Sequence, residues 1–304
     1  MEKKFTQQYE AVRSGGTGFI GMKRGLIAVW GKEAVQFLNG MITNDAAKLE
    51  AGAEMLAAFP NAQGRLLALV RVRKTEDKFL FETEEATREK IYQNLFRFTF
   101  AGDFFVEDLS DKYAYFSIQN ASSIQGAKSK IQNLEAIEFQ TKSGIDVFVP
   151  KDSAENFRNE LLNLNAVEIS EDVYEILRIE NGVPLYGVDM DETTIVPELG
   201  IEGLISYNKG CYIGQEIIAR IHFRGHVAKQ LRGLIFDGEN VSVKPNDALT
   251  ALDGKNAGRV TSVTFSPKLG KTIALAYVRY DYLAEGTELK TENQTATVKE
   301  LPFI

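Results

Sequence analysis

The spacing of apolar residues predicts alternating strands and helices over most of the chain. The apolar run at 26–30 predicts a strand, and the apolar residues that follow it, up to Met41, recur at helical spacing. Further strands are predicted at 65–73, 78–82, 113–118 and 145–149. The first three quarters of the chain therefore mix helices and strands.

Three further helices are predicted from residues that favour helix starts. Thr83 is expected to cap a helix whose first turn is acidic, as the helix dipole favours, and whose inner face reaches Phe98. Ser153 and Ser170 are expected to cap two more helices, the second of which ends at Asn181-Gly182. In each case the hydroxyl can accept a hydrogen bond from a backbone N–H of the first turn.

The last quarter of the chain has a different pattern. From Leu231 onward there are about six short strand-like runs, separated by glycine-containing turns. The clearest runs lie at 231–236, 257–264, 271–278 and 295–298. This spacing predicts a small antiparallel β-barrel.

Composition narrows the class of protein. The 304 residues include 44% hydrophobic residues and carry a net charge of −7, which describes a globular chain and argues against direct nucleic-acid binding over its whole surface. One cysteine and two histidines are too few for a usual structural zinc site, so no metal ligands are assigned. With neither a secretory signal nor a transmembrane run, we expect a cytoplasmic protein that does not bind membranes.

Charge is segregated in the third quarter. Residues 180–204 contain six acidic residues and no lysine or arginine. Residues 205–232 contain one acid, both histidines and these five basic residues: Lys209, Arg220, Arg224, Lys229 and Arg232. The local positive excess suits an anionic ligand, although solvated faces of a helix and a strand would give the same pattern.

The only cysteine, Cys211, lies inside this basic stretch. It precedes a short helix predicted at 215–221 and is two residues from Lys209, and both features favour a thiolate. The alternative is that Cys211 is a small buried packing residue. His222 and His226 have the spacing of helical metal ligands, but Gly225 between them argues against a helix there.

Glu180 is unusual because it falls in the last turn of its predicted helix. There a carboxylate meets the negative end of the helix dipole, at a cost of roughly 0.3 to 1 kcal/mol. A carboxylate can accept two parallel N–H bonds, which suits the edge of a pterin or guanine. The alternative is a surface charge offset by Arg178.

The stretch 209–216, Lys-Gly-Cys-Tyr-Ile-Gly-Gln-Glu, together with Arg220 and Phe223-Arg224-Gly225, resembles the signature of the YgfZ family of folate-binding proteins. Segments 26–45, 61–67, 178–198 and 257–267 resemble the wider superfamily that includes the glycine-cleavage aminomethyltransferase. The resemblance implies an α+β fold. In it, a mixed α/β folate-binding region of two intertwined subdomains, residues 1–225, precedes a C-terminal antiparallel β-barrel, residues 226–304.

The resemblance also implies a function: binding of tetrahydrofolate or a derivative, and assembly or repair of iron–sulfur clusters in client enzymes, including tRNA-modifying enzymes. It makes Cys211 the key functional residue, with Lys209 beside it, and Glu180 the pterin-binding carboxylate. The expected folate-binding residues are Arg178, Glu180, Tyr186, Lys209, Arg220 and Arg224. The basic members are expected to meet the negatively charged glutamate tail.

One departure from the superfamily bears on the type of reaction. In aminomethyltransferases the segment that matches 64–69 carries an acidic residue, whereas Gly-Arg-Leu-Leu-Ala-Leu contains none. Whether the chain is an enzyme therefore stays open. A folate-dependent one-carbon transferase is one alternative, with Asp45 or Asp103 as a substitute acid, and a folate-binding module without catalysis is another.

Overall fold

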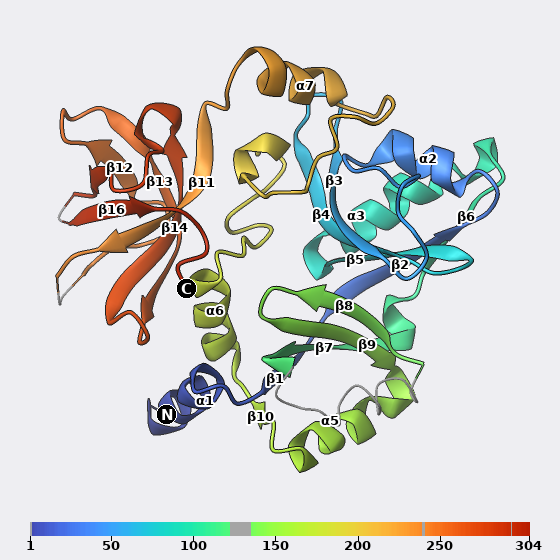
Figure 1. Ribbon diagram of the computed structural model, residues 1–304, viewed down its shortest axis with the longest axis horizontal. Helices are drawn as coiled ribbons and strands as arrows, with labels where there is room; N and C mark the ends of the chain where they lie inside the picture. The colour runs from blue at the N-terminus through green and yellow to red at the C-terminus, as the bar shows by residue number, and fades with distance from the viewer. Residues whose placement is uncertain (1, 122–134, 239–240, 293) are drawn as a thin grey trace. The chain divides into compact units, whose positions relative to one another are not determined.

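The computed structural model describes residues 2–121, 135–238, 241–292 and 294–304 (Figure 1). The chain forms two compact units that are interleaved in sequence. Unit 1 comprises Met1–Gly40, Asn44–Ala57 and Ala68–Tyr174, and unit 2 comprises Met41–Thr43, Ala58–Leu67 and Glu175–Ile304. These units do not follow the predicted boundary at 225/226, which falls between the helix α7 and the first barrel strand.

Unit 1 contains a five-stranded sheet with the order β10-β1-β7-β9-β8. Its strands are β1 (Gly18–Met22), β7 (Tyr113–Gln119), β8 (Ile137–Thr141), β9 (Gly144–Pro150) and β10 (Val167–Glu168). All neighbours pair antiparallel except β1 and β10. Phe157 and Leu161 of helix α5 (Ala154–Asn163) pack on the apolar face of this sheet. Ser153 takes the predicted N-cap position of α5, but its side chain makes no capping bond.

The second sheet has the order β3-β4-β5-β2-β6, and most of it belongs to unit 1. Its strands are β2 (Arg24–Trp30), β3 (Glu54–Pro60), β4 (Leu66–Lys74), β5 (Lys78–Glu84) and β6 (Phe105–Asp108), and the helices between them are α2 (Ala34–Met41) and α3 (Glu85–Phe96). The predicted cap at Thr83 is wrong, because Thr83 lies in β5 and Glu84 precedes the helix. Phe98 lies beyond the end of α3.

A buried cluster of charges joins the two sheets of unit 1. Glu82 of β5 accepts hydrogen bonds from Arg24 Nε at 2.5 Å and from Arg71 Nε at 2.8 Å. Arg71 also donates through Nη2 to Asp146 of β9. Burial alone would raise the pKa of Glu82, but Arg24 and Arg71 lower it to about 2.

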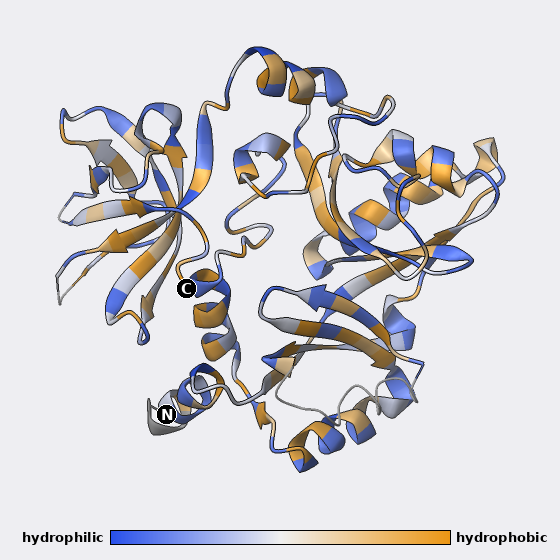
Figure 2. Ribbon diagram, viewed as in Figure 1, coloured by the Kyte–Doolittle hydropathy of each residue, from blue (hydrophilic) through white to orange (hydrophobic). Residues whose placement is uncertain are grey.

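Unit 2 contains the predicted barrel, a closed antiparallel barrel of six strands. Its strands are β11 (Lys229–Phe236), β12 (Ala248–Ala251), β13 (Asn256–Ser266), β14 (Lys271–Arg279), β15 (Glu288–Lys290) and β16 (Thr295–Lys299). Figure 2 shows apolar residues along each of the long strands β11, β13 and β14. Alternate residues such as Leu234, Ala276 and Val298 are fully buried and fill the interior.

Two further helices carry the residues of interest in unit 2. Helix α6 (Glu171–Glu180) crosses from unit 1 into unit 2, begins directly after Ser170 and ends before Gly182, as predicted. Helix α7 (Gln215–Arg224) leads to the barrel. Between them the chain is irregular apart from the short 3-10 helix η5 (Val196–Leu199).

The remaining helices among the described residues are α1 (Glu2–Arg13) and the 3-10 turns η1 (Thr99–Ala101), η2 (Ser110–Lys112), η4 (Lys151–Ser153) and η6 (Tyr280–Tyr282). In the described part of the chain, none of the helices combines the length and the apolar character that crossing a membrane requires.

Candidate functional site

All of the predicted site residues lie in unit 2, and they fall into two places. Arg178, Glu180 and Tyr186 lie at the end of α6 and in the loop after it. Lys209, Cys211, Arg220 and Arg224 lie in the turn before α7 and on α7 itself.

Glu180 is fully buried at the end of α6. Ser266, at the end of β13, donates a hydrogen bond through its hydroxyl to Glu180 Oε1, and the backbone N–H of Leu269 donates to Ser266 Oγ at 3.2 Å. The backbone carbonyl of Glu180 accepts a bond from the N–H of Phe303 at 2.9 Å. The interpretation of Glu180 as a surface charge offset by Arg178 is therefore wrong.

Arg178 is 4% exposed, and its guanidinium is bonded to protein groups. Nη1 donates to Asp189 Oδ2 at 2.7 Å and to the carbonyl of Val183 at 2.6 Å, while Nε donates to Glu175 at 2.7 Å. Burial alone would lower the pKa of Arg178, but Glu175 and Asp189 hold it above its usual value. These contacts fix the position of Arg178, and its predicted contact with a folate stays a prediction.

Asp189 anchors the loop after α6 to the barrel. Its buried carboxylate accepts hydrogen bonds from the hydroxyls of Thr261 and Ser262 on β13 and from the backbone N–H of Leu185. Tyr186, half-buried in this loop, forms a backbone bridge with Met190. Asp189 and Ser266 were not among the predicted residues. No periodic pattern of the sequence singles out Asp189, which follows Tyr186-Gly187 by two residues. The same holds for Ser266, a single serine on a barrel strand.

Lys209 is half-buried and fixed at two points. Its Nζ donates to the carbonyl of Ile42 at 2.8 Å and lies 5.0 Å from the centre of the Tyr212 ring. Burial raises the pKa of Tyr212 to about 12. Cys211 lies between these two residues as an exposed free thiol, so the interpretation of Cys211 as a buried packing residue is wrong.

The turn that holds Cys211 depends on Gly214. Gly214 is the N-cap of α7 and has φ +78°, a conformation that L side chains rarely adopt. A Cβ atom on Gly214 would lie 2.3 Å from the carbonyl oxygen of Asn61. The predicted helix at 215–221 is confirmed and extends to Arg224. Of its predicted inner residues, Ile218 is fully buried, and Ile217 and Ile221 are half-buried.

The segment that lacks an acid lies against this turn. Asn61 Oδ1 accepts bonds from the N–H groups of Gln63 and Arg65, and Arg65 donates through Nη1 to the carbonyl of Thr193 at 2.7 Å. The two substitute acids belong to unit 1. Asp45 bonds Asn39 and the N–H of Ala47, and Asp103 is 3.6 Å from Lys32. Both carboxylates therefore already make local contacts.

The two histidines stack on tyrosines. The ring centres of His222 and Tyr207 are 3.6 Å apart, and those of His226 and Tyr280 are 3.5 Å apart. Helix α7 ends at Arg224, so the two histidines do not share a helical face. Among the residues that the structure describes, there is no group of three or more metal-ligating side chains.

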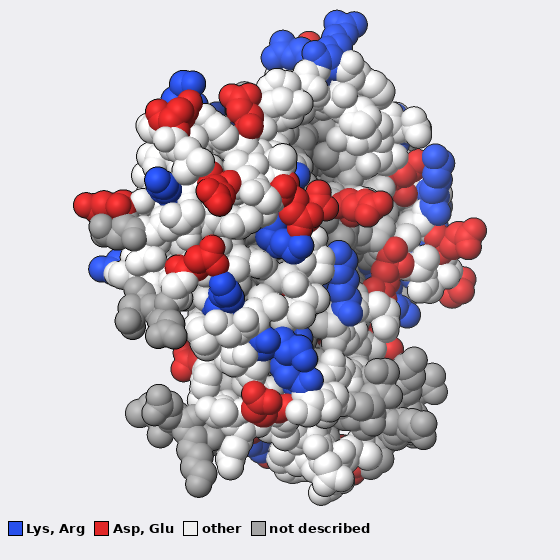
Figure 3. Space-filling view, turned by 60° about the vertical axis from the view of Figure 1, so that its left-hand side comes forward, with Lys and Arg blue, Asp and Glu red and all other residues white. Residues whose placement is uncertain are grey.

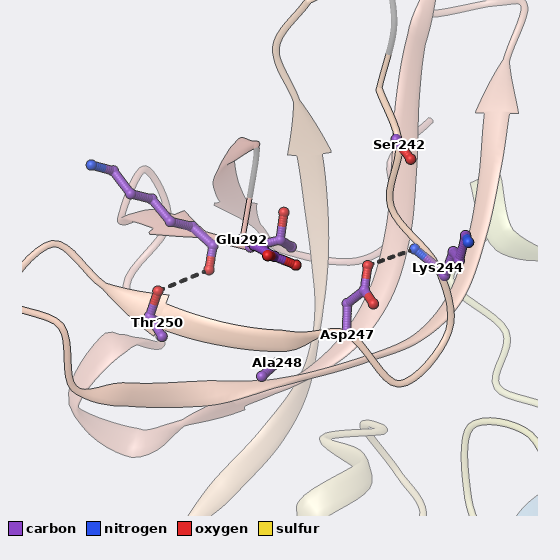
Figure 4. A pocket seen from close by; sticks show the side chains of 8 residues that line it. Ser242, Lys244, Asp247, Ala248, Thr250 and Glu292 are labelled. Carbon is purple, nitrogen blue, oxygen red and sulfur yellow. Dashed lines mark hydrogen bonds between the residues drawn. The ribbon is translucent and has the colours of Figure 1, made fainter.

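A polar pocket of about 660 Å³ opens on the side of the barrel (Figure 4). Its lining residues are Ser242, Lys244, Asp247, Ala248, Thr250, Lys290, Thr291 and Glu292. In Figure 4, Asp247 accepts a hydrogen bond from the backbone N–H of Lys244, and Thr250 donates one to the carbonyl of Lys290. None of the predicted site residues lines this pocket.

Two segments of the chain match domains of known families. Residues 1–142 match the GCVT N-terminal domain, and residues 229–304 match the glycine cleavage T-protein C-terminal barrel domain. The aminomethyltransferase of Thermosipho melanesiensis is 28% identical over 92% of this chain and 83% of its own length. The aminomethyltransferase of Thermotoga neapolitana is 27% identical over 90% of this chain and 81% of its own.

A solved structure shows the same fold. The glycine cleavage system aminomethyltransferase T from Bartonella henselae matches with a TM-score of 0.84 and 22% identity, over 95% of this chain and 86% of its own. The two domain matches, the relatives and this structure agree with each other. Both ends of the chain thus match domains of the glycine cleavage T-protein, and the fold is that of the solved aminomethyltransferase.

Proposed function

We propose that unit 2 binds a reduced folate, with the pterin edge on the carboxylate of Glu180. The match to the GCVT N-terminal domain and the similarity to aminomethyltransferases support a folate ligand. The buried carboxylate of Glu180 fits such a ligand, because a carboxylate can accept two N–H bonds from a pterin edge. Ser266 holds one of its oxygens in place. Lys209, Arg220 and Arg224 are assigned to the glutamate tail.

We further propose that the folate serves a thiol-dependent function of Cys211 in the assembly or repair of iron–sulfur clusters of client enzymes. The observation that carries this proposal is the exposed thiol in a turn whose sequence resembles the YgfZ signature. A single thiol supplies one cluster ligand at most, so Cys211 would act on a cluster that the client protein holds. Such a thiol works in a reducing compartment such as the cytoplasm.

The second candidate is a folate-dependent one-carbon transferase. The names of the relatives favour it over the iron–sulfur function, because all of those compared are aminomethyltransferases. The residues of this chain argue against it: segment 64–69 contains no carboxylate, and Asp45 and Asp103 make local contacts in unit 1.

Folate binding is tested by calorimetry with tetrahydrofolate. We expect the wild type to bind and Glu180→Gln to lose most of its affinity, because the neutral amide offers a single acceptor oxygen. Glu171→Gln, an exposed change at the other end of α6, is the matched control and should bind as the wild type does. Absence of binding to the wild type would rule out the folate assignment.

The use of the folate is tested in a strain that lacks its own family member. Under the iron–sulfur proposal, the wild-type gene restores the activity of an iron–sulfur-dependent tRNA-modifying enzyme and Cys211→Ser does not. Under the transferase alternative, purified protein turns over tetrahydrofolate with an aminomethyl donor, and Cys211→Ser retains that turnover. The two assays therefore give opposite results for the same variant.

A further inference from the structure

An aromatic side chain projects from the end of α7 into solvent. Phe223 is 66% exposed although it is a large apolar residue. Its ring lies edge-on to those of His222 at 4.7 Å and of Tyr207 at 6.1 Å, and these two rings stack on each other. A phenylalanine held in this way loses little conformational freedom when it enters a pocket on a partner.

Two arginines flank this ring. Arg220 and Arg224 are one helical turn apart on α7, and both are exposed. Neither forms an ion pair with any residue that the structure describes. The following arginines each pair with a carboxylate: Arg24, Arg71, Arg73, Arg88 and Arg158. Figure 3 shows Lys and Arg side chains gathered at the top of the molecule, where α7 lies.

The chain directly after α7 is also fixed. His226 stacks on Tyr280, which is 47% exposed, and the backbone N–H of Tyr280 donates to the carbonyl of Ala228 at 3.0 Å. We name the following exposed residues of this region the α7 surface: Arg220, Phe223, Arg224, His226 and Tyr280. They present apolar rings between unpaired positive charges.

We propose that the α7 surface docks a partner protein that presents acidic side chains around an apolar pocket, with Phe223 as the residue that enters the pocket. Arginine and aromatic residues carry most of the binding energy at protein interfaces, and unpaired cations select an acidic partner. Arg220 and Arg224 are also assigned to the glutamate tail, but Phe223 has no part in the proposed folate site, so docking through Phe223 can be tested separately from folate binding.

The arrangement of the rings favours a protein over a single-stranded nucleic acid. Nucleic-acid binding proteins stack successive bases on open aromatic faces. Here one face of each of His222, Tyr207, His226 and Tyr280 is covered by its stacking partner. The net charge of −7 would also repel a phosphate backbone beyond the α7 surface.

The test begins with photo-crosslinking of the full chain in cells. Phe223 is replaced by p-benzoylphenylalanine, and Phe265, a 56% exposed residue of the barrel strand β13, is replaced in the same way as the control. We expect a protein that crosslinks at position 223 and not at position 265. Crosslinking to RNA, crosslinking to a second copy of this chain, or equal products at the two positions would each overturn the proposal.

The crosslinked protein is then purified and titrated by calorimetry. We expect Phe223→Ala to weaken the affinity for this partner at least tenfold. Arg220→Glu should also weaken the affinity, and this loss should be larger at low salt than at high salt. Phe265→Ala should leave the affinity unchanged. Phe223→Ala should bind tetrahydrofolate with wild-type affinity, which separates this test from that of the folate site. An unchanged affinity of the partner for Phe223→Ala would contradict the proposal.

Discussion

The hydroxyl of Ser266 donates a hydrogen bond to the carboxylate of Glu180, and both side chains are fully buried. The two residues are far apart in sequence, one at the end of α6 and the other at the end of the barrel strand β13. This bond ties the proposed pterin-binding carboxylate to the barrel. The barrel thus helps to set the direction of a side chain that lies outside it.

Ser266→Ala is expected to lower the free energy of unfolding by about 2 kcal/mol, because a buried carboxylate loses a hydrogen bond. The affinity for tetrahydrofolate should fall as well, since Glu180 is no longer held. Urea unfolding and calorimetry measure the two effects. Thr264→Ala, a half-buried change on the same strand, is the control and should cost less than about 0.5 kcal/mol. Equal effects of the two changes would contradict the role of Ser266.

Asp189→Asn is expected to destabilise the protein by about 3 kcal/mol, because the buried guanidinium of Arg178 loses its fully buried carboxylate partner and keeps only the more exposed Glu175. Asp191→Asn is the matched control. The exposed carboxylate of Asp191 accepts hydrogen bonds from the neighbouring Thr193, so its loss should cost about 1 kcal/mol. Urea unfolding at neutral pH gives the free energy of unfolding of both variants. Similar losses for the two variants would show that the ion pair of Arg178 with Asp189 contributes little.

Acid should destabilise the protein through Glu82. Its pKa in the folded protein is about 2, below the value near 4.5 of an unfolded chain. A carboxyl with a lowered pKa contributes stability that is present above the unfolded value and is lost as the pH falls from about 4.5 towards 2. The loss should be on the order of 3 kcal/mol, measured by urea unfolding at several pH values.

Glu82→Gln is the control for this pH dependence. It removes the titrating group. Between pH 4.5 and pH 2 the free energy of unfolding of this variant should therefore fall less than that of the wild type. At neutral pH the variant should itself be less stable by about 3 to 5 kcal/mol, because Arg24 loses its buried partner and Arg71 keeps only Asp146. A variant with the full acid dependence of the wild type would show that other carboxyls cause it.

Gly214→Ala should destabilise the turn that holds Cys211. The added Cβ would meet the carbonyl oxygen of Asn61, and the positive φ is strained for alanine. Gly203 has a similar φ of +74° but no atom within 4 Å of an added Cβ, so Gly203→Ala is the matched control. Gly214→Ala should lower the free energy of unfolding by at least about 1 kcal/mol more than the control, as thermal unfolding would show.

Cys211 should react with iodoacetamide in the native protein, because its thiol is exposed. Tetrahydrofolate should slow the labelling if the folate lies near the turn, as proposed. The rate is measured by mass spectrometry with and without the ligand, and unfolded protein gives the reference rate. A thiol that reacts only after unfolding would contradict its exposure.

Much of the fold could be predicted from local patterns. The barrel follows from alternating residues and glycine turns, and α6 from its serine cap and glycine end. Several strands were missed because they are short or carry no clear alternation, such as β1, β6 and β10. A hydroxyl before two acids suits a helix start and so predicts a cap at Thr83, but Thr83 lies in β5 and its hydroxyl bonds that of Thr87.

The candidate site was less accessible from the sequence. Cys211, Lys209 and Glu180 stand out through their motif or through their place on a helix. The residues that hold these side chains do not stand out in the sequence. Ser266 contacts Glu180 and Ile42 contacts Lys209 across long stretches of sequence. Such pairings depend on the tertiary fold, and no periodicity along the chain encodes them.

The interleaving of the two units constrains how the protein can be made. Residues 41–43 and 58–67 belong to unit 2 but leave the ribosome long before Glu175–Ile304, which completes that unit. Ile42 and Phe59 are fully buried in the finished protein, and their contacts with residues 175–304 cannot form while unit 1 is synthesised. A chain that stops after Tyr174 would lack the contacts that complete unit 2, so we expect such a fragment to be prone to aggregation.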